Sequence, residues 1–128
     1  MEKKRVFIVD DQEEVLSLLN DSLSGTGFEV MICKEPKKVL ASIKMFKPDL
    51  ILLDLLMPEL GGFEICEILN SDPETHGIPI IIISGFGDLG DVKKAYKLGA
   101  VGYFVKPFAL VDLHKEIIKV IANKENLL

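Results

Sequence analysis

The sequence predicts an α/β fold in which helices cover both faces of a doubly wound, five-stranded parallel sheet. Five short runs of aliphatic residues alternate with segments of helical periodicity, which is typical of this class. Residues 50–58 and 78–84 are apolar almost throughout, as expected for strands that are buried on both faces. The connections are short, with no linker or repeat, so we expect residues 1–128 to form a single domain.

Each element has a local sequence signal. Four expected strands lie at residues 5–10, 50–58, 78–84 and 101–105, and a further one follows the turn glycines within residues 25–33. The expected helices lie at residues 13–23, 35–46, 62–70, 89–99 and 109–124. In the first helix Leu16, Leu19 and Leu23 fall on one face. Pro36 suits a first helical position, and Gly99 suits a left-handed cap at a helix end.

Composition excludes several classes of protein. The 15 basic and 20 acidic residues give a net charge of −5, which does not indicate a nucleic-acid-binding surface. No apolar run approaches the roughly 20 residues needed to cross a bilayer, and early charges argue against a signal peptide. The two cysteines lack metal-site spacing and are expected to be reduced thiols. We therefore expect a cytoplasmic domain that binds neither nucleic acid nor membrane directly.

Polar residues stand at the ends of the expected strands. Asp54 interrupts an apolar run, where an ionised carboxylate costs several kcal/mol unless it is paired, binds a metal or lies at an open strand end. Asp10 and Asp11 close the first strand, Ser84 the fourth and Lys106 the fifth. Ligands of open parallel sheets bind at the carboxyl ends of the strands, so these five residues should converge there.

Such a group of residues suits phosphoryl chemistry. Three neighbouring carboxylates repel one another, and a divalent cation such as Mg²⁺, which prefers hard oxygen ligands, relieves that repulsion. The Lys106 ammonium and the Ser84 hydroxyl can bind the oxygens of a phosphoryl group. Asp54, acting as a nucleophile, could accept the phosphoryl group as an acyl phosphate.

With these residues placed, the chain resembles the receiver domain of two-component response regulators, including the chemotaxis-regulator-like receivers, over essentially its whole length. The matching pieces are "DD" at residues 10–11, "DLLMPELGG" at 54–62, "ISG" at 83–85 and "GYFVKPF" at 102–108. Each piece alone is a weak signal, but their order, each at an expected strand end, is specific. The resemblance implies a flavodoxin-like sheet with strand order 2-1-3-4-5.

The resemblance also implies a metal site. Asp54 would be the phosphoacceptor, and Asp11 and Asp54 would bind Mg²⁺ directly. Asp10 would act mainly through water, and the backbone carbonyl of Leu56 would complete the protein ligands. From the residues alone, Asp10 and Asp11 could also cap the first helix, a normal role for aspartate.

Further roles follow from the same resemblance. Lys106 would pair with the phosphoryl oxygens and precede a cis bond to Pro107. Ser84 would donate to the phosphoryl group, and Tyr103 would turn inward when Ser84 moves; the simpler interpretation of Tyr103 is packing in a short strand. His114 is expected to be exposed on the last helix and is not placed as a phosphotransfer histidine.

The implied function is a signalling switch. A sensor histidine kinase or a histidine phosphotransfer protein would phosphorylate Asp54 with the help of Mg²⁺. The face formed by the fourth helix, fifth strand and last helix would then act on a downstream effector or a fused output domain. The protein would not be an enzyme with turnover on a separate substrate.

Two features depart from common family patterns. Leu56 and Phe86 are apolar where many receivers carry a polar residue, which predicts slow loss of the phosphoryl group. Val101 and Gly102 replace an acidic pair that joins the phosphorylation-dependent dimer of one receiver class. That particular symmetric dimer is therefore in doubt.

Three other functions compete with this one. An aspartyl phosphatase or phosphotransferase would need a second acid two residues after its nucleophile, where this chain has Leu56. A flavin-binding electron carrier would need a Ser/Thr/Gly phosphate loop in place of "DDQEE". A receiver-like module that is never phosphorylated would not need the complete set of site residues.

Overall fold

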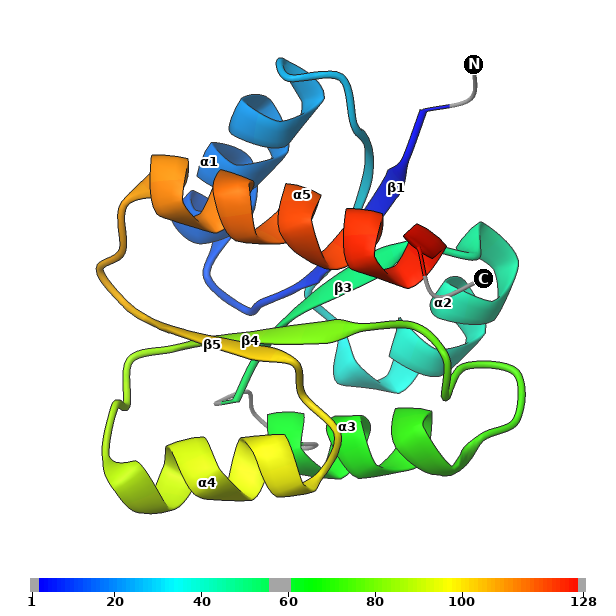
Figure 1. The fold of residues 1–128 in the computed structure, drawn as a ribbon, viewed down its shortest axis with the longest axis vertical. Coiled ribbons are helices and arrows are strands. Elements are labelled where there is room, and N and C mark those ends of the chain that lie inside the picture. Colours follow the sequence, from blue (N-terminus) through cyan, green and yellow to red (C-terminus); the bar gives the residue numbers. More distant parts are fainter. Residues whose placement is uncertain (1–2, 56–60, 127–128) are drawn as a thin grey trace.

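The computed structural model describes residues 3–55 and 61–126. The strands are β1 (Arg5–Val9), β2 (Glu29–Cys33), β3 (Leu50–Asp54), β4 (Ile80–Ser84) and β5 (Gly102–Val105). The helices are α1 (Glu13–Ser24), α2 (Val39–Phe46), α3 (Gly62–Ser71), α4 (Leu89–Lys97) and α5 (Leu110–Asn126), with a 3₁₀ turn at Pro36–Lys38 before α2. Each expected strand and helix is present (Figure 1).

The five strands form one parallel sheet in the order β2-β1-β3-β4-β5, which confirms the expected doubly wound, flavodoxin-like topology. The central strands β3 and β4 are buried along their whole length, which explains why their sequences are apolar rather than alternating. Strand β2 lies at an edge and is partly exposed.

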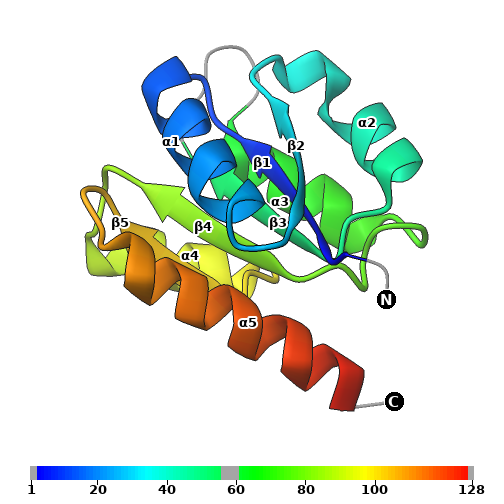
Figure 2. The same ribbon diagram turned by 90° about the horizontal axis from the view of Figure 1, so that it is seen from above.

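Helices cover both faces of the sheet. Helices α1 and α5 lie on one face and α2, α3 and α4 on the other (Figures 1 and 2). On the first face, Leu19 of α1 and Ile117 of α5 belong to one buried cluster with Ile8 and Leu52 of the sheet. The alternating residues of the same strands point to the opposite face. The sheet is therefore the middle layer of a three-layer domain.

The second buried cluster lies under the other three helices. Ile43 of α2, Leu69 of α3 and Ala95 of α4 pack with Phe7 and Leu53 of the sheet. Phe7 and Ile8 are neighbours in β1, and Leu52 and Leu53 are neighbours in β3, yet the members of each pair belong to different clusters. Successive side chains of a strand point to opposite faces, so these strands contribute to both buried clusters.

Helix ends follow the expected chemistry in part. Gly99 has a φ of +108°, the left-handed conformation expected for it just after α4. The N-cap of α1 is Gln12, and its side chain makes no capping hydrogen bond. Asp10 instead accepts the Gln12 backbone N–H at 2.9 Å, so it fixes the turn that leads into the helix. No helix in the described ranges is both long and apolar enough to span a bilayer.

Candidate functional site

The site forms at the edge of the sheet where four neighbouring strands end. Asp10 and Asp11 follow β1, and Asp54 is the last residue of β3. Val9 pairs in register with Leu53, so Asp10 and Asp54 come next on adjacent strands. Asp54 in turn pairs with Ile83, the residue before Ser84. Ser84 pairs with Val105, the residue before Lys106, and this register brings all five expected residues to one edge of the sheet.

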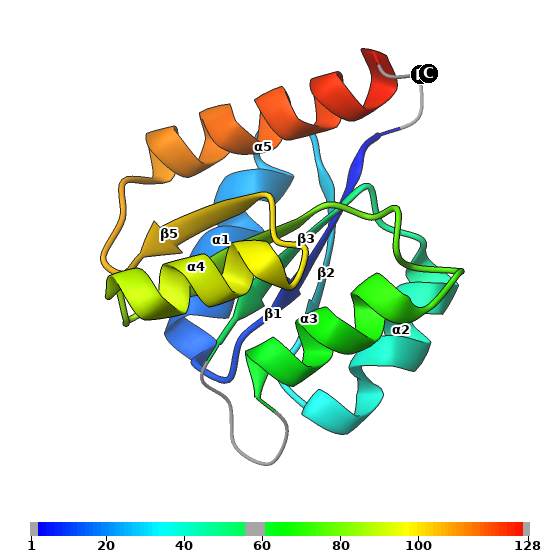
Figure 3. The same ribbon diagram turned by 60° about the horizontal axis from the view of Figure 1, so that its bottom comes forward.

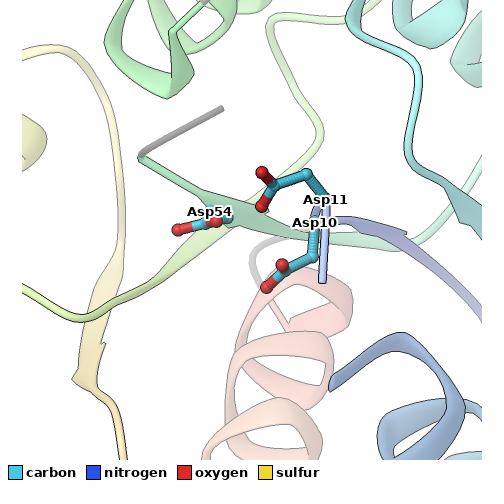
Figure 4. A group of neighbouring side chains, drawn as sticks. All are labelled: Asp10, Asp11 and Asp54. Carbon is cyan, nitrogen blue, oxygen red and sulfur yellow. The ribbon is translucent and has the colours of Figure 1, made fainter. Parts of the chain in front are cut away.

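The three aspartates form a compact acidic cluster. Asp10, Asp11 and Asp54 each offer a carboxylate oxygen, and these oxygens all lie within 4.8 Å of one another (Figure 4). Among the described residues, this is the only group of three or more such side chains that could hold a metal ion. Asp10 is fully buried, Asp54 is 4% exposed and Asp11 is exposed. The cluster is thus open to a ligand on the side of Asp11.

Lys106 faces two of these carboxylates. The Lys106 Nζ atom lies 2.8 Å from Asp10 Oδ2 and 3.8 Å from Asp54 Oδ2, and the side chain is 18% exposed. Three carboxylates beside one ammonium leave a formal excess of two negative charges. A divalent cation would balance that excess, and an all-oxygen site of carboxylates suits Mg²⁺.

Hydrogen bonds explain how Asp10 can be buried. Its Oδ1 accepts the backbone N–H of Gln12 at 2.9 Å, and its Oδ2 accepts Lys106 Nζ at 2.8 Å. Its own N–H donates to the Cys33 carbonyl at 3.3 Å. Lys106 Nζ also donates to Gln12 Oε1 at 2.8 Å. Gln12 was not among the residues predicted for the site. Its position directly after the acidic pair could have indicated that it lies there.

The two expected switch residues meet at one backbone position. The Phe86 N–H donates to Ser84 Oγ at 3.1 Å, and the Tyr103 hydroxyl donates to the Phe86 carbonyl. Burial raises the pKa of Tyr103 above its usual value; a hydrogen bond with Ser84 lowers it in part, and nearby carboxylates, Asp54 among them, raise it further. Tyr103 also packs against the buried cluster under α4, so its packing role is real.

Gly62 packs closely against the backbone at the end of β3. The Gly62 N–H donates to the Leu55 carbonyl at 2.9 Å. A Cβ atom on Gly62 would lie 2.3 Å from the Asp54 carbonyl oxygen and 2.5 Å from Leu55 Cα, so only glycine fits here. Leu56, the expected carbonyl ligand, lies outside the described residues, and its role stays a prediction. The Lys106–Pro107 bond is cis, as expected.

Comparisons with known proteins agree with this geometry. The model of the response regulator receiver domain family matches residues 6–118. The probable transcriptional regulator ycf27 of Cyanophora paradoxa is 33% identical over 124 residues, covering 97% of this chain and 51% of that protein. The DNA-binding response regulator MtrA of Mycobacterium tuberculosis is 32% identical over 111 residues, covering 87% of this chain and 47% of that protein.

A solved structure matches nearly the whole chain. The CheY-like response regulator receiver domain protein of Methanospirillum hungatei has a TM-score of 0.92 and 28% identity, covering 99% of this chain and 100% of that one. By contrast, the chain spans about half the length of the curated relatives it matches. Family model, relatives and fold all agree, and the chain belongs to the response regulator receiver domains of two-component systems.

Proposed function

We propose that Asp54 accepts a phosphoryl group from the histidine of a sensor kinase or of a phosphotransfer protein, and that residues 1–128 act as one receiver unit. One observation carries the proposal. Asp54 is a nearly buried carboxylate at a strand end, beside two further carboxylates and a lysine ammonium. A buried carboxylate in an acidic cluster is costly, so the arrangement favours a role in binding and reaction.

The transfer is a displacement at phosphorus. An Asp54 carboxylate oxygen forms the new O–P bond, and the bond from phosphorus to the donor nitrogen breaks, with its electron pair leaving on the donor. Lys106 is placed to stabilise the phosphoryl oxygens, because its ammonium already lies 3.8 Å from Asp54 Oδ2. The domain changes only its own phosphorylation state, without turnover on a separate substrate.

The acidic cluster supports a requirement for Mg²⁺. Asp11 and Asp54 would hold the ion directly together with the Leu56 carbonyl, and Asp10 would act mainly through water. When bound, the ion supplies positive charge that offsets the repulsion between these carboxylates and an incoming phosphoryl group. Lys106 shares Asp10 with any such cation, so metal binding should weaken the Lys106–Asp10 ion pair and release the ammonium toward Asp54.

The contacts of Phe86 support a route from Asp54 to the surface. Ser84 Oγ accepts the Phe86 N–H, and a rotation toward a phosphoryl group on Asp54 would break that bond. The Phe86 carbonyl holds the Tyr103 hydroxyl, so movement of this residue also changes what Tyr103 can bind. The two switch residues are therefore coupled through the Phe86 backbone as well as through their own contact.

The proposed output face is formed by α4, β5 and α5, which lie along one side of the domain (Figure 3). Lys94 Nζ lies 4.4 Å from the centre of the Phe63 ring, so that side of α4 faces α3. Leu89 and Tyr96 fall on the other side of α4 and are 66% and 48% exposed. These apolar side chains would contact a downstream effector or a fused output domain.

The test is the intact mass of the chain after incubation with acetyl phosphate, with and without Mg²⁺. We expect a gain of one phosphoryl group in the native chain with Mg²⁺, and none in Asp54→Asn. Asp21→Asn, which changes an exposed aspartate of α1, should behave as the native chain. If the folded native chain binds Mg²⁺ but gains no mass, the proposal fails in favour of a receiver-like module that is not phosphorylated. The same samples in sedimentation would show whether phosphorylated copies pair.

A further inference from the structure

Gln12 has no part in the chemistry described above, yet its side chain lies against the lysine of the site. Lys106 Nζ donates to Gln12 Oε1 at 2.8 Å, the same distance as to Asp10 Oδ2. The Gln12 backbone is itself fixed, because its N–H donates to Asp10 Oδ1 at 2.9 Å. The amide oxygen of Gln12 is therefore presented to Lys106 from an anchored residue.

The orientation and the chemistry of this contact are set by the two groups. A lysine ammonium only donates hydrogen bonds, so the carboxamide must turn its oxygen toward Lys106. Gln12 is also the N-cap of α1, a position that favours Ser, Asp or Asn, and its side chain makes no capping bond. The side chain contacts the lysine in place of the helix.

Asp10 and Gln12 differ in how they respond to a cation. The Asp10 carboxylate is shared between Lys106 and any metal that binds the acidic cluster. The Gln12 carboxamide is neutral, attracts a divalent cation less strongly and keeps its oxygen for Lys106. A metal that engages Asp10 would weaken the Lys106–Asp10 hydrogen bond and leave the Lys106–Gln12 hydrogen bond in place.

We propose that Gln12 is a positioning residue, which keeps the Lys106 ammonium at the site when Asp10 is engaged with a metal and thereby sets the rate of phosphoryl uptake by Asp54. The inference rests on the proposed function. Loss of one such hydrogen bond, worth roughly 1 kcal/mol, corresponds to about a fivefold change in rate.

The experiment compares Gln12→Ala and Gln12→Met with the native chain and with Glu14→Ala, an exposed neighbour on α1. Initial rates of phosphoryl uptake from acetyl phosphate are measured at saturating Mg²⁺, and Mg²⁺ affinity is measured by calorimetry. We expect both Gln12 variants to react about fivefold more slowly, with Mg²⁺ affinity changed less than about twofold. Gln12→Met keeps the aliphatic stem, so an equal loss in both variants assigns the effect to the amide oxygen.

Two further measurements separate positioning from a structural effect. In a Lys106→Met background, Gln12→Ala should cause no further slowing, because its effect passes through Lys106. The NMR order parameter at the Lys106 Cε in the Mg²⁺-loaded chain should fall in Gln12→Ala. An unchanged rate, or equal slowing in the Lys106→Met background, would overturn the proposal.

Failure of the proposed function would be visible separately. In that case the native chain takes up no phosphoryl group, while the order parameter still reports whether Gln12 holds the ammonium. An order parameter that is the same with and without the Gln12 side chain overturns the positioning role in either case.

Discussion

Charged side chains gather at both ends of the parallel strands, which we call the amino edge and the carboxyl edge of the sheet. The two groups have different compositions and burial. At the amino edge, where the strands begin, Arg5 joins the start of β2 and the residue before β3 to the end of α2. Its Nε donates to Glu29 Oε2 at 2.9 Å, one guanidinium nitrogen donates to the Phe46 carbonyl at 2.7 Å, and its backbone N–H donates to Asp49 Oδ2 at 2.8 Å. The guanidinium also lies 5.3 Å from the Phe46 ring centre.

At the carboxyl edge, where the strands end, acidic side chains outnumber basic ones. Asp10 and Asp54 are buried beside Asp11, and the Lys106 ammonium lies against Asp10 and near Asp54. At the amino edge, by contrast, the Arg5 and Glu29 side chains are 42% and 48% exposed, so water screens their interaction. Arg5 is an exposed cation with several acceptors, and it links segments of the chain. The carboxyl edge has more buried carboxylates than cations, which favours the binding of a further cation. Three predictions test this contrast.

The largest effect is expected from the glycines of the two edges. Gly62→Ala would place a methyl group against the Asp54 and Leu55 backbone, and overpacking against backbone should lower the free energy of unfolding by about 3 kcal/mol. Gly77 lies in the loop before β4 at the amino edge, and a methyl group added there would meet nothing within 4 Å. Gly77→Ala should therefore change stability by less than about 0.5 kcal/mol. Urea titration gives the free energy of unfolding of both variants. Equal values for the two variants would contradict the close approach at Gly62.

The next effect compares the cations of the two edges. Without metal, Lys106→Met should lower the free energy of unfolding by roughly 2–3 kcal/mol, because buried Asp10 loses its partner. Added Mg²⁺ should restore much of the lost free energy of unfolding, because in this variant Mg²⁺ binds Asp10 without competition from the Lys106 ammonium. Arg5→Met should cost about 1 kcal/mol or less, with the same value with and without Mg²⁺.

Thermal unfolding in EDTA and in Mg²⁺ separates these outcomes. If Mg²⁺ stabilises Lys106→Met no more than it stabilises the native chain, Lys106 does not compete with a cation at the carboxyl edge. A response of Arg5→Met to Mg²⁺ would mean that the two edges are not independent.

The smallest effect concerns pH. Because the folded-state pKa of Tyr103 is raised, chiefly by burial, its contribution to stability is fully present below the ordinary tyrosine pKa of about 10 and is lost as the pH rises through the folded-state value. Absorbance titration of Tyr96→Phe, which leaves Tyr103 as the single tyrosine, should show ionisation above the ordinary value. Asp54→Asn should lower that pKa by removing a nearby negative charge, while Asp21→Asn should leave it unchanged.

Much of the fold and of the candidate site could be predicted because both depend on local pattern. Apolar runs fix the strands, and parallel strands share their carboxyl ends, so Asp10, Asp54, Ser84 and Lys106 had to converge. The family motifs supplied the roles of these residues. Leu56 is the member of the predicted set that stays outside the described structure.

Two predictions from the sequence differ from the structure: the strand expected from residue 50 to 58 ends at Asp54, and His114 is not exposed. His114 was expected to be exposed on the last helix, but it is partly buried and packs edge-on against Phe28, with ring centres 5.8 Å apart. Its charged neighbours in the sequence suggested a solvated face. Helical periodicity places a residue on a side of the helix, but the element packed against that side is set by the fold.

The sequence by itself determined the parallel sheet and the residues at its carboxyl edge, because hydrophobic period and strand direction are properties of the chain, whereas the strand order came from the family resemblance. Only the tertiary structure decided that Gln12 holds Lys106, that Gly62 fits against the Asp54–Leu55 backbone and that Phe86 links Ser84 to Tyr103. Each of these contacts joins residues whose spacing in the chain carries no periodic signal. Each depends on distances of a few ångströms that packing sets and sequence pattern does not encode.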